Sequence, residues 1–449
     1  MKKLTALILA LCMVFALCAC GGSNGNDPDP AKTSGPSGDE TGIPADFKIG
    51  FIFLHDENST YDKNFIDAIN AAVENTGLAP ENFILKTNIP ESDACKTAAE
   101  ELVDAGCNVI IADSFGHEPY LYQVADANPD VQFLHCTGTS AHTKGKTNFH
   151  NGFASIYEGR YLAGVVAGLK LEDMIKNNPS TAHHVGYVGA FTYAEVISGY
   201  TSWYLGVKSI VPDVTMDVRF TGSWYDETAE KEAALALIND GAVLVSQHAD
   251  SMGAPNACEE KGVPNVSYNG STYNACPNTF LVSSRIDWTS IFENLIMATA
   301  NDEGDSLPSD LTGSILDGSV KTTDVGSAAV SRSQAILNQT RNAIVAGDIE
   351  IFDTSTFTVN NAWNADTTGE GFQKQATIDA DGHLLTYKAD VDDFGDYVPE
   401  TQVVSDGAFC TLFPVISVYN IIRLQLFKNF VVHNFFLDNN FAYTVNFFY

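Results

Sequence analysis

Basic side chains are scarce in this chain, and their scarcity limits what it can bind. The 449 residues include 24 Lys and Arg against 56 Asp and Glu, which gives a formal net charge of −32. A surface of this sign repels nucleic acid and anionic lipid headgroups. We therefore expect no nucleic-acid polymer as a partner, and any attachment to a membrane must use something other than a basic patch.

The motifs that carry catalysis or cofactor binding in many enzymes are also missing. No G-x-G-x-x-G follows the first apolar run, the P-loop and H-E-x-x-H patterns do not occur, and no G-x-S-x-G pattern occurs between residues 47 and 409. The cysteines that follow the N-terminal segment show no C-x-x-C pair and no zinc-ligand spacing. The sequence therefore predicts a protein that is not an enzyme and that has no metal and no cofactor.

The first twenty residues have the pattern of a secretion signal. Lys2 and Lys3 precede an apolar run that is too short to span a membrane comfortably as a helix. The run ends in Leu-Cys-Ala-Cys, which resembles a bacterial lipobox, and the alternative is an ordinary cleaved signal peptide. We expect residues 1–19 to be removed, Cys20 to carry a lipid, and residues 20–46, rich in Gly, Ser, Pro and Asp, to form a flexible tether.

Strand and helix signals alternate along the chain from Phe47. Short apolar runs, as in residues 47–55, are followed by stretches with helical spacing of apolar residues, as in 64–77, and a second such set begins at His183. Alternation of this kind predicts βαβ units with parallel sheets. The length exceeds what one core usually contains, so the two sets predict two lobes. Asp381-Gly382, between two strand-like runs, predicts a hairpin turn.

The predicted strand ends share a combination of residue types. Ligands of open α/β sheets bind beyond the carboxyl ends of the strands, and there nearly every strand is followed by an aromatic residue near an acid or an amide. Helix caps and turns explain Ser, Asp and Asn at such positions, but they do not explain the aromatic residues. The aromatic residues in question are Phe115, Phe191, Trp224 and Trp288. We therefore expect these loops to line a shared ligand crevice.

The chemistry of these side chains suits a flat, polar small molecule. Aromatic faces can stack on a planar base, and the carboxylate of Asp56 or Asp250 can accept hydrogen bonds from paired hydroxyls such as those of ribose. The amides of Gln247 and Asn269 can both donate and accept, as the edge of a heterocycle requires. Aromatic faces with acids also occur in sugar sites, so the pattern separates a nucleoside from a sugar only weakly.

Several strings, taken in order, resemble a known family. They are GCNVIIADSFGH, EGRYLAGVVAGLK, VGYVGAFTYAEVISGY, LGVKSIVPDVTMDVRFTGSWYD, AALALINDGAVLVSQHADSMGAPNACEEKGV and VSYNG. The chain resembles the basic membrane protein family of lipoproteins, similar to purine-nucleoside-binding subunits of ABC transporters, from about Phe47 to Phe409. The resemblance implies an α/β type I periplasmic-binding-protein fold, in which two doubly wound parallel-sheet lobes are joined by a multi-strand hinge and close on a ligand.

The resemblance also implies lobe boundaries and ligand contacts. We expect lobe 1 to contain residues 47–180 and about 281–325, and lobe 2 to contain residues 181–280 and about 326–409. The residues implied as ligand contacts are Tyr61, Ser114, Phe115, Phe191, Trp224, Gln247, His248, Asp250, Asn269 and Trp288. Two positions depart from the family pattern: Ser59 stands where relatives have Trp, and Asp113 stands where relatives usually have a small or hydroxyl residue.

The expected function is that of a lipid-anchored solute-binding protein on the outer face of the cell membrane. It is expected to deliver a purine nucleoside or a related small molecule to the permease and ATPase subunits of an ABC importer. The alternatives are a membrane-tethered ligand sensor or a sugar-binding protein of the same fold. Residues 410–449 depart from the family pattern, and we interpret them as a non-native translation, because Arg423, Lys428 and Asp438 interrupt any membrane span.

Overall fold

A computed structural model describes residues 42–138, 140–191, 194–352, 377–378, 384–385 and 416–419. The signal segment with Cys20, nearly all of the predicted tether and most of residues 410–449 lie outside the described residues. None of the helices in the described segments is long and apolar enough to cross a membrane.

The first sheet contains six strands in the order β11-β5-β4-β3-β1-β2, and every pairing in it is parallel. Its strands are β1 (Ile49–Ile52), β2 (Phe83–Lys86), β3 (Val109–Ala112), β4 (Gln132–Cys136), β5 (Phe149–Ala154) and β11 (Asp310–Gly313). The central strands β1, β3 and β4 are buried at every residue. The apolar sequences of β1 and β3 are those expected of parallel strands with both faces covered by helices, whereas β4 also buries the polar residues Gln132 and His135.

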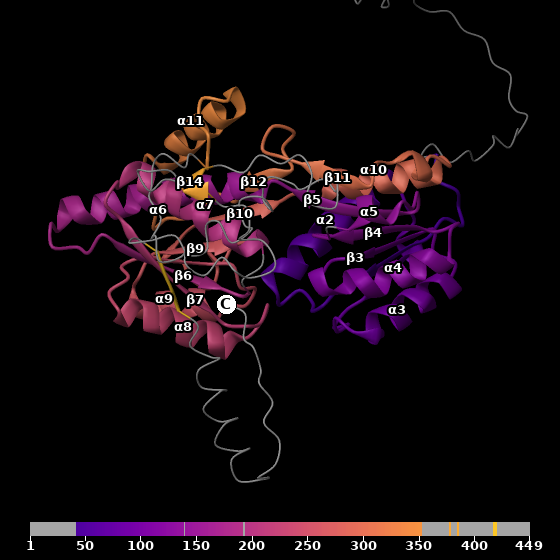
Figure 1. Cartoon of the computed structure of the whole chain (residues 1–449), viewed down its shortest axis with the longest axis horizontal. Coiled ribbons are helices and arrows are strands. Elements are labelled where there is room, and N and C mark those ends of the chain that lie inside the picture. Colours follow the sequence, from indigo (N-terminus) through magenta and orange to yellow (C-terminus); the bar gives the residue numbers. More distant parts are fainter. Residues whose placement is uncertain are drawn as a thin grey trace, which may run out of the picture. The chain divides into compact units, whose positions relative to one another are not determined.

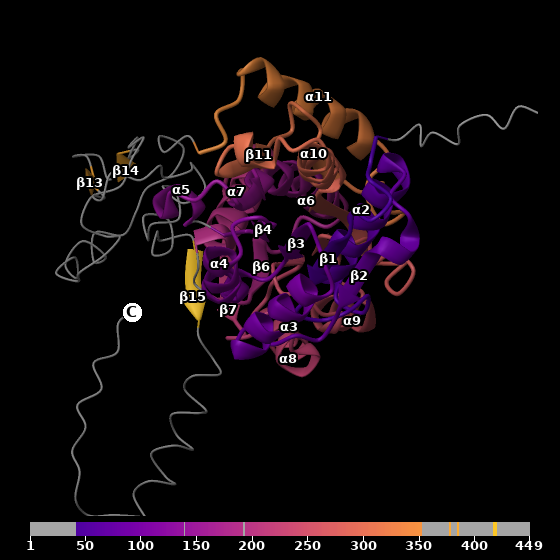
Figure 2. The same ribbon diagram turned by 90° about the vertical axis from the view of Figure 1, so that its right-hand side faces the viewer.

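Helices cover both faces of this sheet. The apolar sides of α2 (Thr60–Thr76) and α10 (Thr289–Ala300) pack on one face, and those of α3 (Asp93–Asp104) and α4 (Glu118–Ala127) pack on the other (Figures 1 and 2). The shorter elements are η1 (Pro80–Asn82), η2 (Phe115–His117), α5 (Ala141–Lys144) and η3 (Gly304–Ser306). The start of α2 is fixed by Ser59, whose side chain accepts a hydrogen bond from the amide of Asp62.

The second sheet contains seven strands in the order β12-β10-β9-β8-β6-β7-β15, with only β12 antiparallel to its neighbour. Its strands are β6 (His184–Gly189), β7 (Thr215–Phe220), β8 (Val245–Gln247), β9 (Asn265–Tyr268), β10 (Phe280–Ile286), β12 (Val320–Thr322) and β15 (Ile416–Tyr419). A separate antiparallel pair, β13 (Thr377–Ile378) and β14 (Leu384–Leu385), flanks the predicted Asp-Gly turn, which itself lies outside the described residues.

Helices also cover both faces of the second sheet. The pair α6 (Ile156–Asn177) and α7 (Ala194–Ile210) lies on one face, and the pair α8 (Glu227–Asn239) and α9 (Gly253–Lys261) on the other, while α11 (Ser333–Ala346) packs on α6. A Cβ on Gly164 of α6 would meet the carbonyl oxygen of Trp203 on α7 at 2.1 Å. This glycine therefore allows the two helix backbones to touch.

The predicted α/β fold with two parallel-sheet lobes is confirmed, but the chain is divided between the lobes differently from the expected boundaries. It passes from one sheet to the other after β5, after β10 and after β11. Helix α6 was expected in lobe 1 but packs on the second sheet, and β10 and β12 pair within that sheet. The difference arises because an apolar run does not reveal which sheet it joins; pairing with β9 decides the position of β10.

Candidate functional site

Four loops at the carboxyl ends of the second sheet contain predicted ligand contacts. Phe191 follows β6, Trp224 follows β7, Asp250 follows β8 and Asn269 follows β9. The rings of Phe191 and Trp224 lie edge to face with centroids 5.0 Å apart. The amide of Asp250 donates to the carbonyl of Trp224 at 2.9 Å. Parallel strands place their carboxyl ends at one edge, so residues that are far apart in the sequence become neighbours.

The carboxyl group of Asp250 is buried without compensation. The residue is 4% exposed, and within the described segments no side chain or amide donates a hydrogen bond to its carboxylate. Burial raises the pKa of Asp250 well above its usual value, and the nearby carboxylates of Asp62, Glu230 and Glu195 raise this pKa further. A buried carboxylate of this kind is stabilised by a molecule that supplies N–H or O–H donors.

A network of polar side chains lies beside Asp250. His248 Nε2 is 2.7 Å from Glu195 Oε2, and the hydroxyl of Tyr268 donates to Glu195 Oε1 at 2.5 Å. On the other side of the imidazole, His248 Nδ1 is 3.2 Å from the hydroxyl of Tyr187, which also accepts from Arg160. Burial opposes ionisation of Glu195, but His248 and the two hydrogen bonds together lower the pKa of Glu195 below its usual value.

Glu195 is a candidate site residue that the sequence did not reveal. It lies in the first turn of α7, whereas ligand contacts were predicted only in the loops at the strand ends. The sequence signal for Glu195 is an acid a few residues after the carboxyl end of β6. An acid in the first turn of a helix is explained equally well by its favourable interaction with the helix dipole.

Two amide side chains have free hydrogen-bonding atoms. Gln247 is fully buried, and its Nε2 donates to the carbonyls of Ala249 and Ser251, while its Oε1 has no partner among the described residues. The Nδ2 of Asn269 is likewise buried and has no partner in the part of the chain that the structure describes. Asn269 also has a φ of 62°, in the left-handed region that non-glycine residues seldom adopt. One acceptor and one donor are therefore available for a ligand, in a backbone conformation of the kind that concentrates at functional sites.

The first sheet contributes residues from the loops that follow β1 and β3. The hydroxyl of Tyr61 donates to the carbonyl of Asp113 at 2.7 Å. Ser114 Oγ donates to Glu91 Oε1 at 2.6 Å, so this hydroxyl donor is already used within the protein. Phe115 is 38% exposed, which leaves a large part of its ring accessible. Asp56 accepts hydrogen bonds from the backbone and the side chain of Asn58, as expected for a residue that shapes its own loop.

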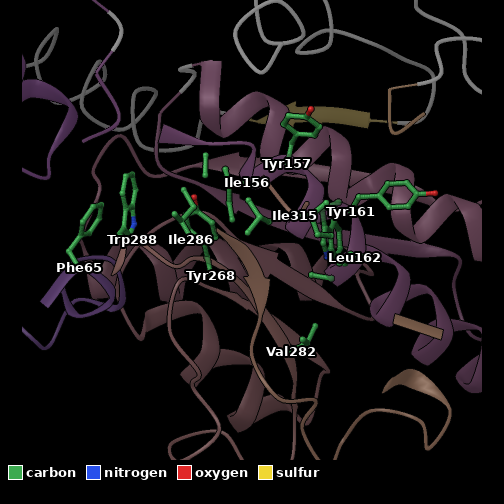
Figure 3. Close-up of a cluster of buried hydrophobic side chains, with 14 of the residues drawn as sticks. Phe65, Ile156, Tyr157, Tyr161, Leu162, Tyr268, Val282, Ile286, Trp288 and Ile315 are labelled. Atoms are coloured by element: carbon green, nitrogen blue, oxygen red, sulfur yellow. The ribbon is translucent and has the colours of Figure 1, made fainter. Parts of the chain in front are cut away.

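The structure places Trp288 in the core. Its side chain is 1% exposed, and its ring stacks on Phe65 with centroids 4.5 Å apart (Figure 3). Trp288 also stacks on Phe292, with ring centroids 6.1 Å apart. The position of Trp288 after a strand predicts a contact with the ligand, but these neighbouring rings already cover the Trp288 ring. Trp288 therefore contributes packing beneath the site.

The loops of the two sheets meet at Thr60 and Asp250. The amide and the hydroxyl of Thr60, at the start of α2, both donate to the carbonyl of Asp250, at 3.1 Å and 3.2 Å. The rings of His55 and Tyr225 also lie 5.1 Å apart. The candidate site is therefore formed by loops from both sheets.

Chemistry other than binding finds little support in these residues. Among the described residues, no three His, Cys, Asp or Glu side chains gather in a way that could hold a metal ion. The five cysteines in the described part of the chain are buried and unpaired. Burial raises the pKa of the Cys95 thiol to about 12, which makes its thiolate a poor candidate nucleophile.

Two parallel sheets with helices on both faces, and polar and aromatic loops meeting from both, define the class of two-lobed α/β solute-binding proteins. The chain belongs to the Bmp family, described as ABC transporter substrate-binding protein PnrA-like, whose family model matches residues 52–355. The predicted family resemblance is thereby confirmed.

Three known proteins illustrate the similarity. The chain is 30% identical over 247 residues to a purine-binding protein of Brucella abortus, covering 55% of this chain and 63% of that protein. It is 33% identical over 193 residues to a putative ABC transporter glucose-binding protein of Haloferax volcanii, covering 43% and 46%. An ABC transporter solute-binding protein of Aeropyrum pernix has the same fold, with a TM-score of 0.58 at 15% identity, covering 68% of this chain and 92% of that one. The aligned segments span less than two thirds of the two sequence relatives.

Proposed function

We propose that the protein binds a purine nucleoside or a closely related small molecule between its two lobes and delivers it to an ABC importer. The observation on which the proposal chiefly rests is Asp250, a buried carboxylate with acids around it and aromatic residues beside it. Paired hydroxyls of a ribose supply the donors that this carboxylate requires. The name of the purine-binding relative supports a purine as the base.

The proposed binding mode assigns a role to each group of side chains. Phe191 and Trp224 provide apolar faces for the base, and Gln247 Oε1 with Asn269 Nδ2 provides one acceptor and one donor for its polar edge. Closure of the lobes removes water from these groups and strengthens each hydrogen bond. No step of this scheme makes or breaks a covalent bond.

The proposed partners are the permease and ATPase subunits of an importer, because the chain belongs to a family of ABC substrate-binding proteins. We also propose that Cys20 is lipidated and attaches the protein to the outer face of the cell membrane, with no basic patch involved. The lipobox-like sequence before the Gly- and Ser-rich segment supports this attachment. Mass spectrometry of the protein purified from membranes tests it, because a mature N-terminus without lipid contradicts the proposal.

A sugar is the second candidate ligand, and the name of the Haloferax volcanii relative supports it. Aromatic faces and acids suit a pyranose as well as a nucleoside, so the composition of the site does not decide between them. The amides of the site favour a base, because Gln247 Oε1 can accept and Asn269 Nδ2 can donate, as the edge of a heterocycle requires.

A thermal-shift panel on the full-length protein tests the assignment. The compounds are purine nucleosides, free purine bases and hexoses, and a ligand at a hundredfold excess over its Kd stabilises the protein by about 2.7 kcal/mol. We expect a nucleoside to raise the melting temperature and Trp224→Ala to abolish the shift. Asp67→Asn, at a site 55% exposed, is the control that should preserve the shift. A shift with hexoses alone overturns the nucleoside assignment.

A further inference from the structure

Two buried carboxyl groups lie side by side beneath the loop that follows β1. The amide of Leu54 donates to Asp113 Oδ1 at 3.2 Å, and the next amide along the chain, that of His55, donates to Asp62 Oδ1 at 2.7 Å. Asp113 follows the last residue of β3, and Asp62 lies in the first turn of α2. Both residues are 0% exposed. Consecutive amides of one loop are thus bound to carboxyl groups from two different elements.

The second oxygen of each carboxyl group receives no hydrogen bond from an N–H group. Asp62 Oδ2 and Asp113 Oδ2 are both buried, and among the described residues no backbone or side-chain N–H group makes a hydrogen bond to either of them. The two side chains form a hydrogen bond with each other. A hydrogen bond between two carboxyl groups needs a proton between them, because two carboxylates in contact repel each other. The pair therefore contains one proton in the folded protein.

The surrounding groups do not neutralise a second negative charge on this pair. His117 Nδ1 is 3.9 Å from Asp113 Oδ1, but burial lowers the pKa of His117 to about 4, so this ring is neutral near pH 7. His55 Nδ1 is 3.4 Å from Asp62 Oδ2 and is partly exposed. The other titratable groups around the pair are Asp250, Tyr61, Cys95 and Cys136, which add no positive charge.

The proton is assigned to Asp113. Burial and the neighbouring Asp62 carboxylate both raise the pKa of Asp113 well above its usual value. Asp62 instead has the His55 imidazole beside it, with His55 Nδ1 3.4 Å from Asp62 Oδ2. Asp113 therefore donates a hydrogen bond to Asp62, while each residue also accepts one from the loop backbone.

This pair encloses Tyr61, a predicted ligand contact. Tyr61 is the residue directly before Asp62, and its hydroxyl donates to the carbonyl oxygen of Asp113 at 2.7 Å. The backbone of Tyr61 is thus held next to Asp62, and its hydroxyl is held by the carbonyl of Asp113. These two contacts fix the position of the aromatic ring. Thr60, whose amide and hydroxyl bind the carbonyl of Asp250 in the other lobe, is the next residue toward the N-terminus.

We propose that Asp62 and Asp113 form one proton-sharing carboxyl pair that positions Tyr61 and the loop after β1, so that ligand affinity depends on a proton that the ligand does not contact. Both residues are positioning residues in this scheme. Loss of the proton at high pH separates the two carboxylates, displaces the loop and moves Tyr61 and Thr60 together. The ligand readout rests on the proposed function, whereas the stability readout does not.

Three variants of the full-length protein test the pair. In Asp113→Asn the new amide keeps the acceptor for Leu54 and donates permanently to Asp62, so no proton is needed. In Asp62→Asn the amide donates to Asp113, which can then ionise. In the double variant the two NH2 groups face each other, and no arrangement satisfies both amides and both backbone N–H groups. Each single variant should therefore be tolerated, and the double variant should lose far more than the sum of the two.

The measurements are melting temperature and adenosine affinity between pH 5 and pH 9. The wild type should lose about tenfold or more in affinity over the alkaline part of this range, as expected when one proton is lost, whereas Asp113→Asn should stay nearly constant. The melting temperature of the wild type should fall relative to that of Asp113→Asn as the pH rises. Parallel pH profiles, or additive effects in the double variant, overturn the proposal.

The two proposals fail in distinguishable ways. If adenosine binds at no pH while the melting profiles of wild type and Asp113→Asn still diverge, the carboxyl pair stands and the nucleoside assignment fails. If adenosine binds with a pH profile that the three variants do not change, the site stands and the pair is a structural contact only, which overturns its positioning role.

Discussion

His248 and Glu195 form an imidazole–carboxylate pair that joins two strand ends of the second sheet, with His248 Nε2 2.7 Å from Glu195 Oε2. His248 follows β8, whereas Glu195 lies at the start of the helix after β6. The His248 side chain is 2% exposed, while that of Glu195 is 24% exposed. The carboxylate is therefore the accessible end of a network that extends through Tyr187 to Arg160. Its exposure allows Glu195 to contact a ligand.

Removal of this carboxylate should weaken ligand binding. Glu195→Ala leaves His248 and the Tyr268 hydroxyl without their shared acceptor, and hydrogen bonds to charged groups contribute about 1.5–3 kcal/mol each. We expect a loss of affinity of roughly tenfold or more, with partial recovery in Glu195→Gln, measured by isothermal titration calorimetry. Glu232→Gln, an exposed carboxylate on α8, is the matched control. Unchanged affinity in Glu195→Ala removes this residue from the site.

The two tryptophans at strand ends should respond differently to truncation. Trp288 is buried and stacks on Phe65 and Phe292, so Trp288→Ala should destabilise the protein by about 3–5 kcal/mol. Trp224 is only partly buried, so Trp224→Ala should reduce the free energy of unfolding less than Trp288→Ala does. It should reduce the affinity for a nucleoside more than Trp288→Ala does. Urea unfolding gives the first quantity and calorimetry the second. Equal stability losses in the two variants contradict this separation of core from site.

These two tryptophans also show where inference from the sequence reached its limit. Alternating apolar runs and helical spacing predicted the two sheets, because the periodicity of buried residues follows directly from strand and helix geometry. An aromatic residue after a strand predicts a ligand contact at both positions. The distinction depends on whether residues from α2 and α10 cover the ring, and this packing joins Trp288 to Phe65, which is remote in the sequence.

The same limit applies to the acids. Asp113 was recognised as a departure from the family pattern, but its contact with Asp62 depends on how β3 and α2 are brought together. Glu195 was not predicted because it lies within helix α7, and not in a loop at a strand end. Strand pairing also decided the position of β10, which joins β9 and not the first sheet. Sequence patterns predicted the elements, whereas contacts between remote elements determined which polar residues share a site.

Asp250 should show a trade-off between stability and binding. Its raised pKa means that the folded protein retains a proton which the unfolded chain releases, so this group lowers stability as the pH rises above about 3.8. Asp250→Asn should therefore raise the melting temperature of the ligand-free protein at pH 7 and abolish the shift caused by a nucleoside. A lower melting temperature together with preserved binding contradicts both parts of the argument.

Glu230 should contribute a pH dependence of stability in a defined window. Its carboxylate accepts from the amides of Asp226 and Ser251, and burial raises its pKa from 4.5 to about 7. The folded state binds more protons between these two values, so stability is highest below about 4.5 and falls as the pH rises to about 7. Melting curves of Glu230→Gln should show a flatter profile in this window. Asp226→Asn provides a comparison, because it changes the helix cap without removing the buried carboxyl group.

A phosphorylated ligand should bind more weakly than the corresponding nucleoside. Glu195, whose pKa is lowered, brings negative charge to the site, while the Nη1 and Nη2 groups of Arg160 already donate to carbonyl and hydroxyl oxygens within the protein. A 5′-phosphate adds up to two negative charges, and like charges at about 4 Å repel by several kcal/mol when partly buried. We expect adenosine 5′-monophosphate to bind at least about tenfold more weakly than adenosine in calorimetry, with the gap narrowing in Glu195→Gln. Added salt should reduce this difference in affinity less than it would at an exposed site, since buried charges are poorly screened. Equal affinities would show that the phosphate lies outside the site, in solvent, and that Glu195 does not select against anionic ligands.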